Sequence, residues 1–488
     1  MLGKIAKAFG KTVDEGAPSI YLYNTLGRKN EEFTPPSERP VRMYNCGPTV
    51  YGRQHIGNLA MFVFTDILRR MLELNKMKVK QVINITDFGH LSSDGDTGED
   101  KMTRGLKKEG MDVTLENMLL LGEKYTNTFK KDLRALGVDV DNISFPRASD
   151  YVGNQKNMIR VLLEKGYAYD ISGGIYFDTS VFKHYGELGN IDTETLKEGA
   201  RTEINKEKRN PADFVLWKRD EKIGWESEWG GGFPGWHIEC SAMIRAELGE
   251  QIDIHTGGIE HIGVHHNNEI AQSESAIGKR PLSRFWLHRA HIQIDGKKIA
   301  KSEGNVLYLD EIEAKGYSPL AYRYWLLTAH YRTPSNFTFQ AMDAAQNAYT
   351  RLKEHYFSTT KQAAALDNGH ILDASDYISD FTKHINNDLD TPGALAVVWN
   401  MVKDKNVHPV DKLSALDAFD CVLGLSLRSG VAETSAIAIP PKVQLLVDER
   451  KQARLAENWV KADKLREKIE AAGYTVKDTA DGPKITAK

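Results

Sequence analysis

The chain has few cysteines, no long apolar segment and almost no net charge, and each shortage excludes a class of protein. Three cysteines in 488 residues, without framework spacing, argue against a disulfide-built secreted domain and favour a reducing compartment. No apolar run approaches the roughly 18 residues of a membrane helix. The basic segment 1–11 lacks the apolar core of a signal peptide. We therefore expect a cytoplasmic protein without a membrane partner.

The overall charge and composition are those of an ordinary globular protein. A net charge of −3 excludes binding of nucleic acid through a globally positive surface, but it allows a local basic surface. Hydrophobic residues make up 41% of the chain and charged residues 27%, which is typical of a soluble protein. A chain of 488 residues is expected to contain roughly two to four domains.

Two cysteines, a pair of histidines and a glutamate have the side chains of a zinc site. If a helix begins near His265, that histidine and Glu269 lie four residues apart on one face. The thiols of Cys46 and Cys240 would complete a set of acceptable zinc ligands, and their distance along the chain favours an active site over a zinc finger. The spacing alone does not choose between His265 and His266. The alternative is ordinary buried thiols beside polar surface histidines.

A strand, a helix and a second strand are predicted between residues 41 and 85. Residues 41–45 and 79–85 have the pattern of strands, and the apolar residues between them recur at helical steps. These apolar residues are Leu59, Phe62, Val63, Ile67, Leu68, Met71 and Leu72. This order predicts a right-handed parallel crossover and therefore an α/β fold.

Polar and small residues follow both of these strands. Cys46 and Gly47 come after the first strand and Thr86 after the second, where parallel sheets bind their ligands. His55 and Asn58 open the helix, where backbone N–H groups and the helix dipole favour a phosphate. The sequence therefore predicts a ligand site at this edge of the sheet.

Two later strand-like segments lead into loops that suit a nucleotide. Residues 251–255 run into Gly257 and Gly258, whose small size allows close approach of a flat or phosphorylated ligand. Residues 290–294 lead into the lysine-bearing loop 295–305, which suits a polyphosphate whose charge grows in a transition state. Lysine loops are, however, usually solvated surface.

In this order the motifs resemble those of the class I aminoacyl-tRNA synthetases. His55-Ile56-Gly57-Asn58 is similar to the HIGH signature of that class, and Lys298-Ile299-Ala300-Lys301-Ser302 is similar to its KMSKS loop. Four longer segments resemble the cysteinyl-tRNA synthetase family more narrowly: 43–51, 84–87, 234–243 and 265–273. The likeness extends from about Tyr21 to Asp481.

The resemblance implies a role for each matching residue. It selects Cys46, Cys240, His265 and Glu269 as ligands of one zinc ion per chain. It places Gly47, Thr86 and Trp236 against the amino acid. It implies that ATP, accompanied by Mg²⁺, binds His55, Gly57, Asn58, Gly257, Gly258 and Lys301. The catalytic residues would be His55, Asn58, Lys298 and Lys301.

The chain departs from the family pattern at three positions. Ile299 and Ala300 replace the usual methionine and serine of the lysine loop, but neither change removes a charge. We therefore expect a slower or retuned loop that still functions. Glu260 stands where an aspartate is common, and its longer carboxylate could still reach a ribose hydroxyl.

The resemblance also implies the domain organisation. A Rossmann-type catalytic domain would be split by an insertion and followed by an α-helical bundle and a small C-terminal domain. The expected boundaries are 1–17 for an N-terminal extension, 18–149 and 233–316 for the catalytic halves, 150–232 for the insertion, 317–425 for the tRNA-binding bundle, 426–442 for a linker and 443–488 for the anticodon-binding domain. Within the insertion we expect a helix near 158–163 and a strand at 174–178.

The last expected domain contains a cluster of positive charge around Trp459. The cations are Arg450, Lys451, Arg454, Lys461, Lys464, Arg466 and Lys468. Such residues could hold phosphates while the ring stacks on a base. The acidic residues Glu457, Asp463 and Glu467 are interleaved with them, which is equally typical of a solvated helix face. The resemblance to the anticodon-binding tail of the family favours tRNA.

The implied activity is ATP-dependent joining of L-cysteine to cysteine tRNA. Zinc would recognise the substrate thiolate, a contact that serine cannot supply. One alternative is the related mycothiol-pathway ligase, which joins cysteine to an amino sugar. The helical region after Tyr317, the basic tail and Glu269 argue against it. A second alternative is a non-catalytic tRNA-binding paralogue, which the altered lysine loop would mark.

Overall fold

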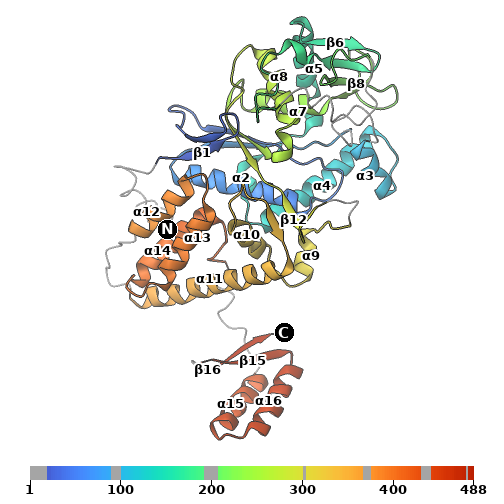
Figure 1. The fold of residues 1–488 in the computed structure, drawn as a ribbon. Coiled ribbons are helices and arrows are strands. Elements are labelled where there is room, and N and C mark those ends of the chain that lie inside the picture. Colours follow the sequence, from blue (N-terminus) through green and yellow to red (C-terminus); the bar gives the residue numbers. More distant parts are fainter. Residues whose placement is uncertain are drawn as a thin grey trace. The chain divides into compact units, whose positions relative to one another are not determined.

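Two compact units make up the chain in a computed structural model of the protein (Figure 1), and they divide between Leu427 and Arg428. The structure describes residues 19–89, 100–191, 207–299, 304–366, 375–429, 441–479 and 482–487. The expected N-terminal extension 1–17 lies outside these ranges, as does Lys301. Within them, no helix is both long enough and apolar enough to cross a membrane.

The first unit is organised around a parallel sheet. The strand order is β11 (Ser283–Arg289), β10 (Ile252–Gly258), β3 (Val41–Asn45), β4 (Val79–Ile83) and β5 (Ile143–Ser144). All four neighbouring pairs run parallel. Strand order reverses between β3 and β10, so the loops after these two strands diverge and leave a crevice for a ligand. Cys46 lies at this point, and its amide donates to the Thr256 carbonyl at 3.1 Å.

The predicted strand–helix–strand unit is confirmed. Helix α2 (Ile56–Leu74) joins β3 to β4, and all seven apolar residues predicted for its inner face are buried. Helices α7 (Trp236–Glu247) and α8 (His265–Ile277) pack against each other, and α5 (Val152–Glu164) packs against α7. Their buried side chains form one core with Trp217 and Trp286, both fully buried.

A second sheet occupies the region expected to be an insertion. It is antiparallel and contains β6 (Ala168–Ile171), β7 (Gly174–Phe177), β8 (Phe214–Arg219) and β9 (Gly232–Pro234). The helix and strand predicted here correspond to α5 and β7. In Figure 1 this sheet lies with α5 at the end of the unit remote from α11.

The prediction of a strand over residues 290–294 is only partly right. Strand β12 covers Ile292–Ile294 and belongs to a separate small sheet with β13 (Lys297–Lys298) and β14 (Ser335–Phe337). The fifth strand of the parallel sheet is β11, which the sequence pattern did not reveal. Its residues include a buried histidine and a buried arginine, so its composition does not show that it is a core strand.

The region after Tyr317 is mainly helical, as predicted. Its helices are α10 (Pro319–Leu327), α11 (Phe339–Ala365), α12 (Ser375–Asn386), α13 (Thr391–Lys403) and α14 (Pro409–Leu423), and α9 (Leu309–Ala314) precedes them. Asp390 caps α13, where its side chain accepts from the Gly393 amide. Arg323 joins this region to the catalytic part, because its fully buried guanidinium donates to Asp66 of α2 at 2.6 Å.

Two further helices of the first unit pack against each other. Helix α3 (Lys101–Glu109) packs on α4 (Leu115–Ala135) through a small apolar core of Met102, Leu106, Met118 and Leu121. A short hairpin of β1 (Tyr21–Asn24) and β2 (Lys29–Glu32) contacts β11 on the other edge of the parallel sheet.

Within its described residues, the second unit consists of two helices and a hairpin. They are α15 (Pro441–Leu455), α16 (Trp459–Ala471), β15 (Tyr474–Thr479) and β16 (Gly482–Ala487). Val443, Val447, Ile469 and Val476 form its core. Arg450 is also buried, with 3% of its surface exposed, so the idea that this residue contacts phosphate is wrong. Lys461, Lys464 and Lys468 are exposed along α16.

Candidate metal centre and active site

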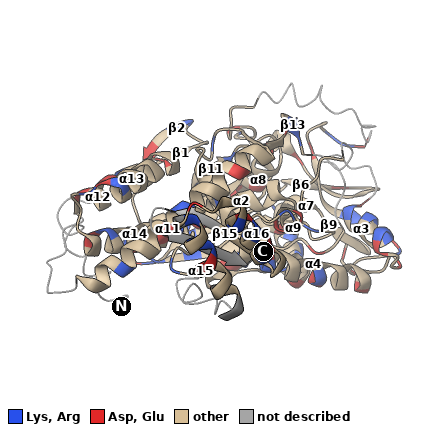
Figure 2. Ribbon diagram, turned by 90° about the horizontal axis from the view of Figure 1, so that it is seen from below, with Lys and Arg blue, Asp and Glu red and all other residues tan. Residues whose placement is uncertain are grey.

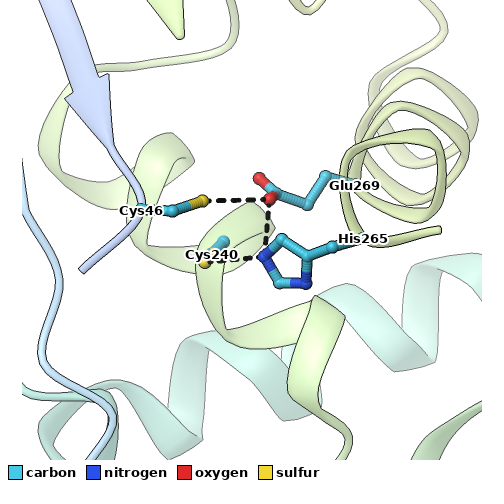
Figure 3. Close-up of side chains that lie close together, drawn as sticks. All are labelled: Cys46, Cys240, His265 and Glu269. Carbon is cyan, nitrogen blue, oxygen red and sulfur yellow. Dashed lines mark hydrogen bonds and ion pairs between the residues drawn. The ribbon is translucent and has the colours of Figure 1, made fainter. Parts of the chain in front are cut away.

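Four side chains with zinc-binding atoms converge from three segments of the chain (Figure 3). Cys46 follows β3, Cys240 lies on α7, and His265 and Glu269 lie one turn apart on α8. All four are buried, and their candidate ligand atoms lie within 4.8 Å of one another. The helical spacing proposed for His265 and Glu269 is therefore present in the fold.

The separations between these atoms fit a single small cation. Cys46 Sγ lies 3.7 Å from Glu269 Oε1, and Cys240 Sγ lies 3.7 Å from His265 Nε2. His265 Nε2 and Glu269 Oε1 are 2.9 Å apart. Around tetrahedral zinc with its usual bond lengths, ligand atoms are separated by about 3.3–3.8 Å. The donor set and its spacing thus fit zinc after a small relaxation of the imidazole–carboxylate contact.

A second group of four atoms satisfies the same geometric test. It shares Cys46 and Glu269 with the first group but contains His255 and His266. Cys46 Sγ lies 3.3 Å from His266 Nε2, and Glu269 Oε2 lies 2.9 Å from His255 Nε2. The geometry alone therefore defines two overlapping candidate sites. The sequence spacing likewise did not choose between His265 and His266.

The charges of the first group are strongly coupled. Burial alone would lower the pKa of His265, but Glu269 and Cys240 raise it to about 10. Burial would raise the pKa of Glu269, yet His255 and His265 hold it far below its usual range. A hydrogen bond from Cys46 lowers the pKa of Cys240 to about 6, whereas burial raises the pKa of Cys46. The site therefore favours ionised Glu269 and Cys240, and these negative charges can bind a cation.

A chain of buried histidines surrounds the candidate ligands, and sequence reasoning missed it. His237 Nδ1 lies 2.8 Å from His265 Nδ1, and His266 Nδ1 lies 2.8 Å from His288 Nε2. The ring of His255 is stacked with Trp286 at 4.4 Å between centroids. These contacts fix ring orientations, as hydrogen bonds to the second imidazole nitrogen do in metal sites. The density of histidine between residues 237 and 291 was the available signal.

The three residues predicted to contact the amino acid lie around this cluster. Trp236 is half-buried, and its ring centroid is 4.3 Å from that of His265. Thr86 is buried and donates its hydroxyl to Glu239 Oε2 at 2.7 Å. Gly47 packs closely against Asn84, the residue that follows β4. A Cβ added to Gly47 would lie 1.6 Å from the Asn84 carbonyl oxygen. Only glycine fits this close approach.

A cavity of about 350 Å³ opens beside the cluster. Of the residues predicted to bind ATP or act in catalysis, His55, Gly57, Asn58, Gly258 and Lys298 line it. Cys46 lines it as well, so the cavity connects the candidate metal centre to the nucleotide residues. Gly257 is not one of its lining residues, and Lys301 and Ala300 lie outside the described residues.

The start of α2 is arranged for an anion. His55 is the N-cap residue, and its Nδ1 accepts from the Asn58 amide at 3.2 Å. The first turn of α2 contains no acidic residue, so nothing there neutralises the positive end of the helix dipole. Glu260 also lines the cavity, and its Oε2 lies 3.5 Å from His291 Nδ1.

Comparisons with known proteins show which family the chain resembles. Residues 32–347 match the family model described as the catalytic domain of class I (C) tRNA synthetases. The chain is 42% identical over 472 residues to cysteine–tRNA ligase 1 of Burkholderia lata, with 96% of each chain covered. It is 40% identical to cysteine–tRNA ligase of Treponema denticola, with 95% of this chain and 98% of that relative covered.

A solved structure has the same fold at low sequence identity. Methionyl-tRNA synthetase of Mycobacterium tuberculosis in complex with methionyl-adenylate superposes with a TM-score of 0.57. It is 14% identical and covers 81% of this chain and 93% of its own. The likeness confirms the predicted Rossmann-type α/β fold.

Proposed function

The chain belongs to the cysteine–tRNA ligase family of class I tRNA synthetases, and we propose from this premise that it activates L-cysteine with ATP and transfers it to cysteine tRNA. The observation that carries the proposal is the position of the candidate metal centre. The candidate metal ligands Cys46, Cys240, His265 and Glu269 adjoin a cavity that is lined by five of the predicted nucleotide or catalytic residues: His55, Gly57, Asn58, Gly258 and Lys298. A substrate cysteine held at the metal centre would present its carboxylate to a nucleotide held in the cavity.

Zinc is the metal that this donor set suits best. Two thiols, one imidazole and one carboxylate match its preference for sulfur and nitrogen, whereas magnesium and calcium prefer oxygen alone. When bound, zinc would supply a soft partner for the substrate thiolate, which the hydroxyl of serine cannot replace. Such a specific contact supports discrimination of about 10⁴–10⁵ without an editing step. Trp236, Thr86 and Gly47 would hold the rest of the amino acid.

The first step is nucleophilic attack of the cysteine carboxylate on the α-phosphate of ATP. The bond to pyrophosphate breaks, and cysteinyl-adenylate and pyrophosphate, with its Mg²⁺, are the products. No protein nucleophile is required, so the residues act by position and charge. The phosphates would be bound by His55, Asn58 and the start of α2. The nucleotide would lie beside Gly257 and Gly258. The developing charge would be stabilised by Lys298 and Lys301.

The second step transfers the acyl group to the tRNA. The 2′-hydroxyl of the terminal adenosine attacks the carbonyl carbon of the adenylate, loses its proton and displaces AMP. The remaining parts of the chain would hold the tRNA: the insertion 150–232 near the acceptor end, the helices of 317–425 along the body and residues 443–488 at the anticodon. The expected extension 1–17 and linker 426–442 have no assigned contact.

Two assays on one preparation test the proposal. Cysteine-dependent exchange of pyrophosphate into ATP reports the first step, and charging of cysteine tRNA reports the second. We expect both activities, and serine should support neither at equal concentration. Exchange without charging, but with acylation of an amino sugar, would identify the mycothiol-pathway alternative. Binding of tRNA with neither activity would identify a non-catalytic paralogue.

A further inference from the structure

A buried arginine at the end of β11 lines the nucleotide cavity, and no motif of the sequence assigned it a role. Arg289 is the last residue of this strand and pairs in register with Gly258, one of the predicted nucleotide residues. Only 6% of its surface is exposed. It lines the cavity of about 350 Å³ together with His55 and Asn58. Arg289 therefore lies at the carboxyl edge of the parallel sheet, where such sheets bind their ligands.

The guanidinium of Arg289 has few partners in the part of the chain that the structure describes. Its Nη1 donates to the Ala290 carbonyl at 2.9 Å, and this is its single side-chain hydrogen bond there. No carboxylate of the described residues forms an ion pair with it. Glu260, a carboxylate that lines the same cavity, lies beside His291 instead. A guanidinium carries five N–H donors, so most of them remain available to a ligand.

Burial makes this positive charge costly. Lys107 and Lys108 of α3 are exposed, and Figure 2 shows the positive charge gathered on that helix, where water solvates it. Arg289 has no such solvation, and burial lowers the pKa of its guanidinium to about 10, a shift that Tyr322 opposes. The group still carries its charge at neutral pH. A charge buried without a counter-ion destabilises the folded state, so this position is best explained by an anionic ligand.

The protein around Arg289 leaves room for that anion only in the nucleotide cavity. Arg289 also lines a second, much smaller cavity of about 20 Å³. The lining of this small cavity includes Val63, Phe64 and Leu326 and contains no aspartate or glutamate. A space of this size holds about one water molecule. An anion of several atoms must therefore approach Arg289 from the nucleotide cavity.

The positive end of α2 adds to the attraction for an anion. Tyr322, which interacts electrostatically with Arg289, donates its hydroxyl to the Ile56 carbonyl in the first turn of α2 at 3.0 Å. That turn contains no acidic residue. A buried cation and the positive end of a helix dipole thus border one cavity, and a phosphate would stabilise both.

The chemistry of the two steps indicates which phosphate Arg289 contacts. The β- and γ-phosphates of ATP leave as pyrophosphate and must reach solvent, whereas the α-phosphate stays with the nucleoside in ATP, cysteinyl-adenylate and AMP. We infer that Arg289 binds the α-phosphate of the nucleotide beside the start of α2. The planar fork of a guanidinium matches two phosphate oxygens. This inference rests on the proposed function and adds a binding residue that serves both steps.

AMP and adenosine test the contact in the full-length, zinc-loaded protein, because the two ligands differ by this phosphate alone. Arg289→Met removes the charge and keeps an unbranched side chain. It should weaken AMP binding roughly tenfold or more, since a charge-assisted hydrogen bond is lost, and leave adenosine binding within about twofold. Arg289→Lys keeps the charge but loses the planar fork, so its AMP affinity should lie between the two.

Arg284→Met is the matched control, because it removes an exposed charge from the same strand at a residue that lines neither cavity. It should bind both ligands as the wild type does. Thermal unfolding without ligand gives an independent readout. Arg289→Met should unfold at the same temperature as the wild type or higher, because the charge that it removes has no counter-ion. Saturating AMP should raise Tm less in this variant than in the wild type.

The opposite results would overturn the inference. Equal weakening of AMP and adenosine would show that Arg289 shapes the cavity or contacts the base. A lower Tm with unchanged AMP binding would show a purely structural role. If Arg289→Met does not fold, Arg289→Lys decides, and unchanged AMP binding in that variant would overturn the contact. Absence of cysteine-dependent exchange and charging in the wild type would refute the proposed function itself, while AMP binding would still report on Arg289.

Discussion

Cys240 distinguishes the two overlapping groups of candidate ligands, because only the first contains it. We expect about one zinc per chain in protein purified without added metal. Cys240→Ser should weaken zinc retention and raise KM for cysteine together, since the same ion is expected to bind the substrate. His266→Gln, which removes a member of the second group, should retain zinc. Elemental analysis of both variants decides the matter, and the opposite pattern would assign the metal to His255 and His266.

The coupled charges of the cluster predict that zinc binding releases protons. At pH 7.5, His265 with a pKa of about 10 carries a proton, and the raised pKa of Cys46 keeps its thiol protonated. Cys240, with a pKa of about 6, is already ionised. Because zinc binds neutral imidazole and thiolate, about two protons should leave per ion.

Titration calorimetry in buffers of different ionisation enthalpy measures this release. Zinc affinity should also rise with pH, since protons compete with the metal at His265, with a pKa of about 10, and at Cys46, whose pKa is raised by burial. A binding enthalpy that is the same in every buffer would contradict the expected release.

Lys301 lies outside the described residues, so its role stays a prediction from the sequence. Lys301→Ala should lower the exchange rate by roughly 10²-fold, because it removes a cation aimed at the growing phosphate charge. Lys297→Ala is the control, since Lys297 is an exposed β13 lysine that does not line the nucleotide cavity. If Lys301→Ala exchanged pyrophosphate at the wild-type rate, the lysine loop would have no role in the first step.

At the scale of elements, one buried arginine joins helices α2, α10 and α14. Arg323 of α10 donates to the Leu423 and Leu136 carbonyls and to the carboxylate of Asp66. Arg323→Ala would leave Asp66 buried with one fewer partner and two carbonyls without this donor. We expect the free energy of unfolding to fall by about 3–5 kcal/mol.

Denaturant unfolding measures this loss against a matched substitution. Arg351→Ala removes an exposed arginine of α11 and should change the free energy of unfolding by less than about 0.5 kcal/mol. If the two substitutions cost the same, the buried ion pair does not stabilise the junction between the catalytic and helical parts.

The elements that the sequence predicted well are those with a simple hydrophobic period. Helix α2 has apolar residues at three- and four-residue steps, and β3 and β4 are short strands bounded by glycine, proline or polar residues. Strand β11 was missed because His288 and Arg289 are buried in it. Their burial depends on partners that lie elsewhere, such as Thr25, whose hydroxyl lies 2.8 Å from His288 Nδ1.

At the scale of the whole molecule, the second unit can be removed without touching the proposed catalytic residues. A chain that ends at Ser429 should retain cysteine-dependent pyrophosphate exchange. Its charging activity should fall mainly through a raised KM for tRNA, and the dependence of tRNA binding on salt should become shallower as phosphate contacts are lost. Filter binding over a range of salt concentrations measures the slope.

A full-length variant separates loss of charge from loss of the unit. Lys461, Lys464 and Lys468 are exposed on α16, so changing all three to alanine should produce the same pattern more mildly. Arg450 is unsuitable for this test, because it is buried and its removal would disturb the unit. An unchanged salt slope in both proteins would show that the tail is a solvated helix face.

The sequence by itself determined the α/β class, the family and the set of candidate ligands. Periodic apolar residues specify which face of a helix is buried, and motifs in a fixed order specify a family even when no contact is known. These are local or one-dimensional properties, so they can be read along the chain. The candidate zinc ligands Cys46, Cys240, His265 and Glu269 were predicted in this way, with the family resemblance selecting His265.

Only the tertiary structure decided which of these residues meet and what surrounds them. The parallel pairing of β3 with β10 places Cys46 beside α7 and α8, and this arrangement creates the coupled charges and the chain of buried histidines. It also created a second possible ligand group. Burial and electrostatic coupling depend on distances in space between residues remote in sequence, so no pattern along the chain contains them.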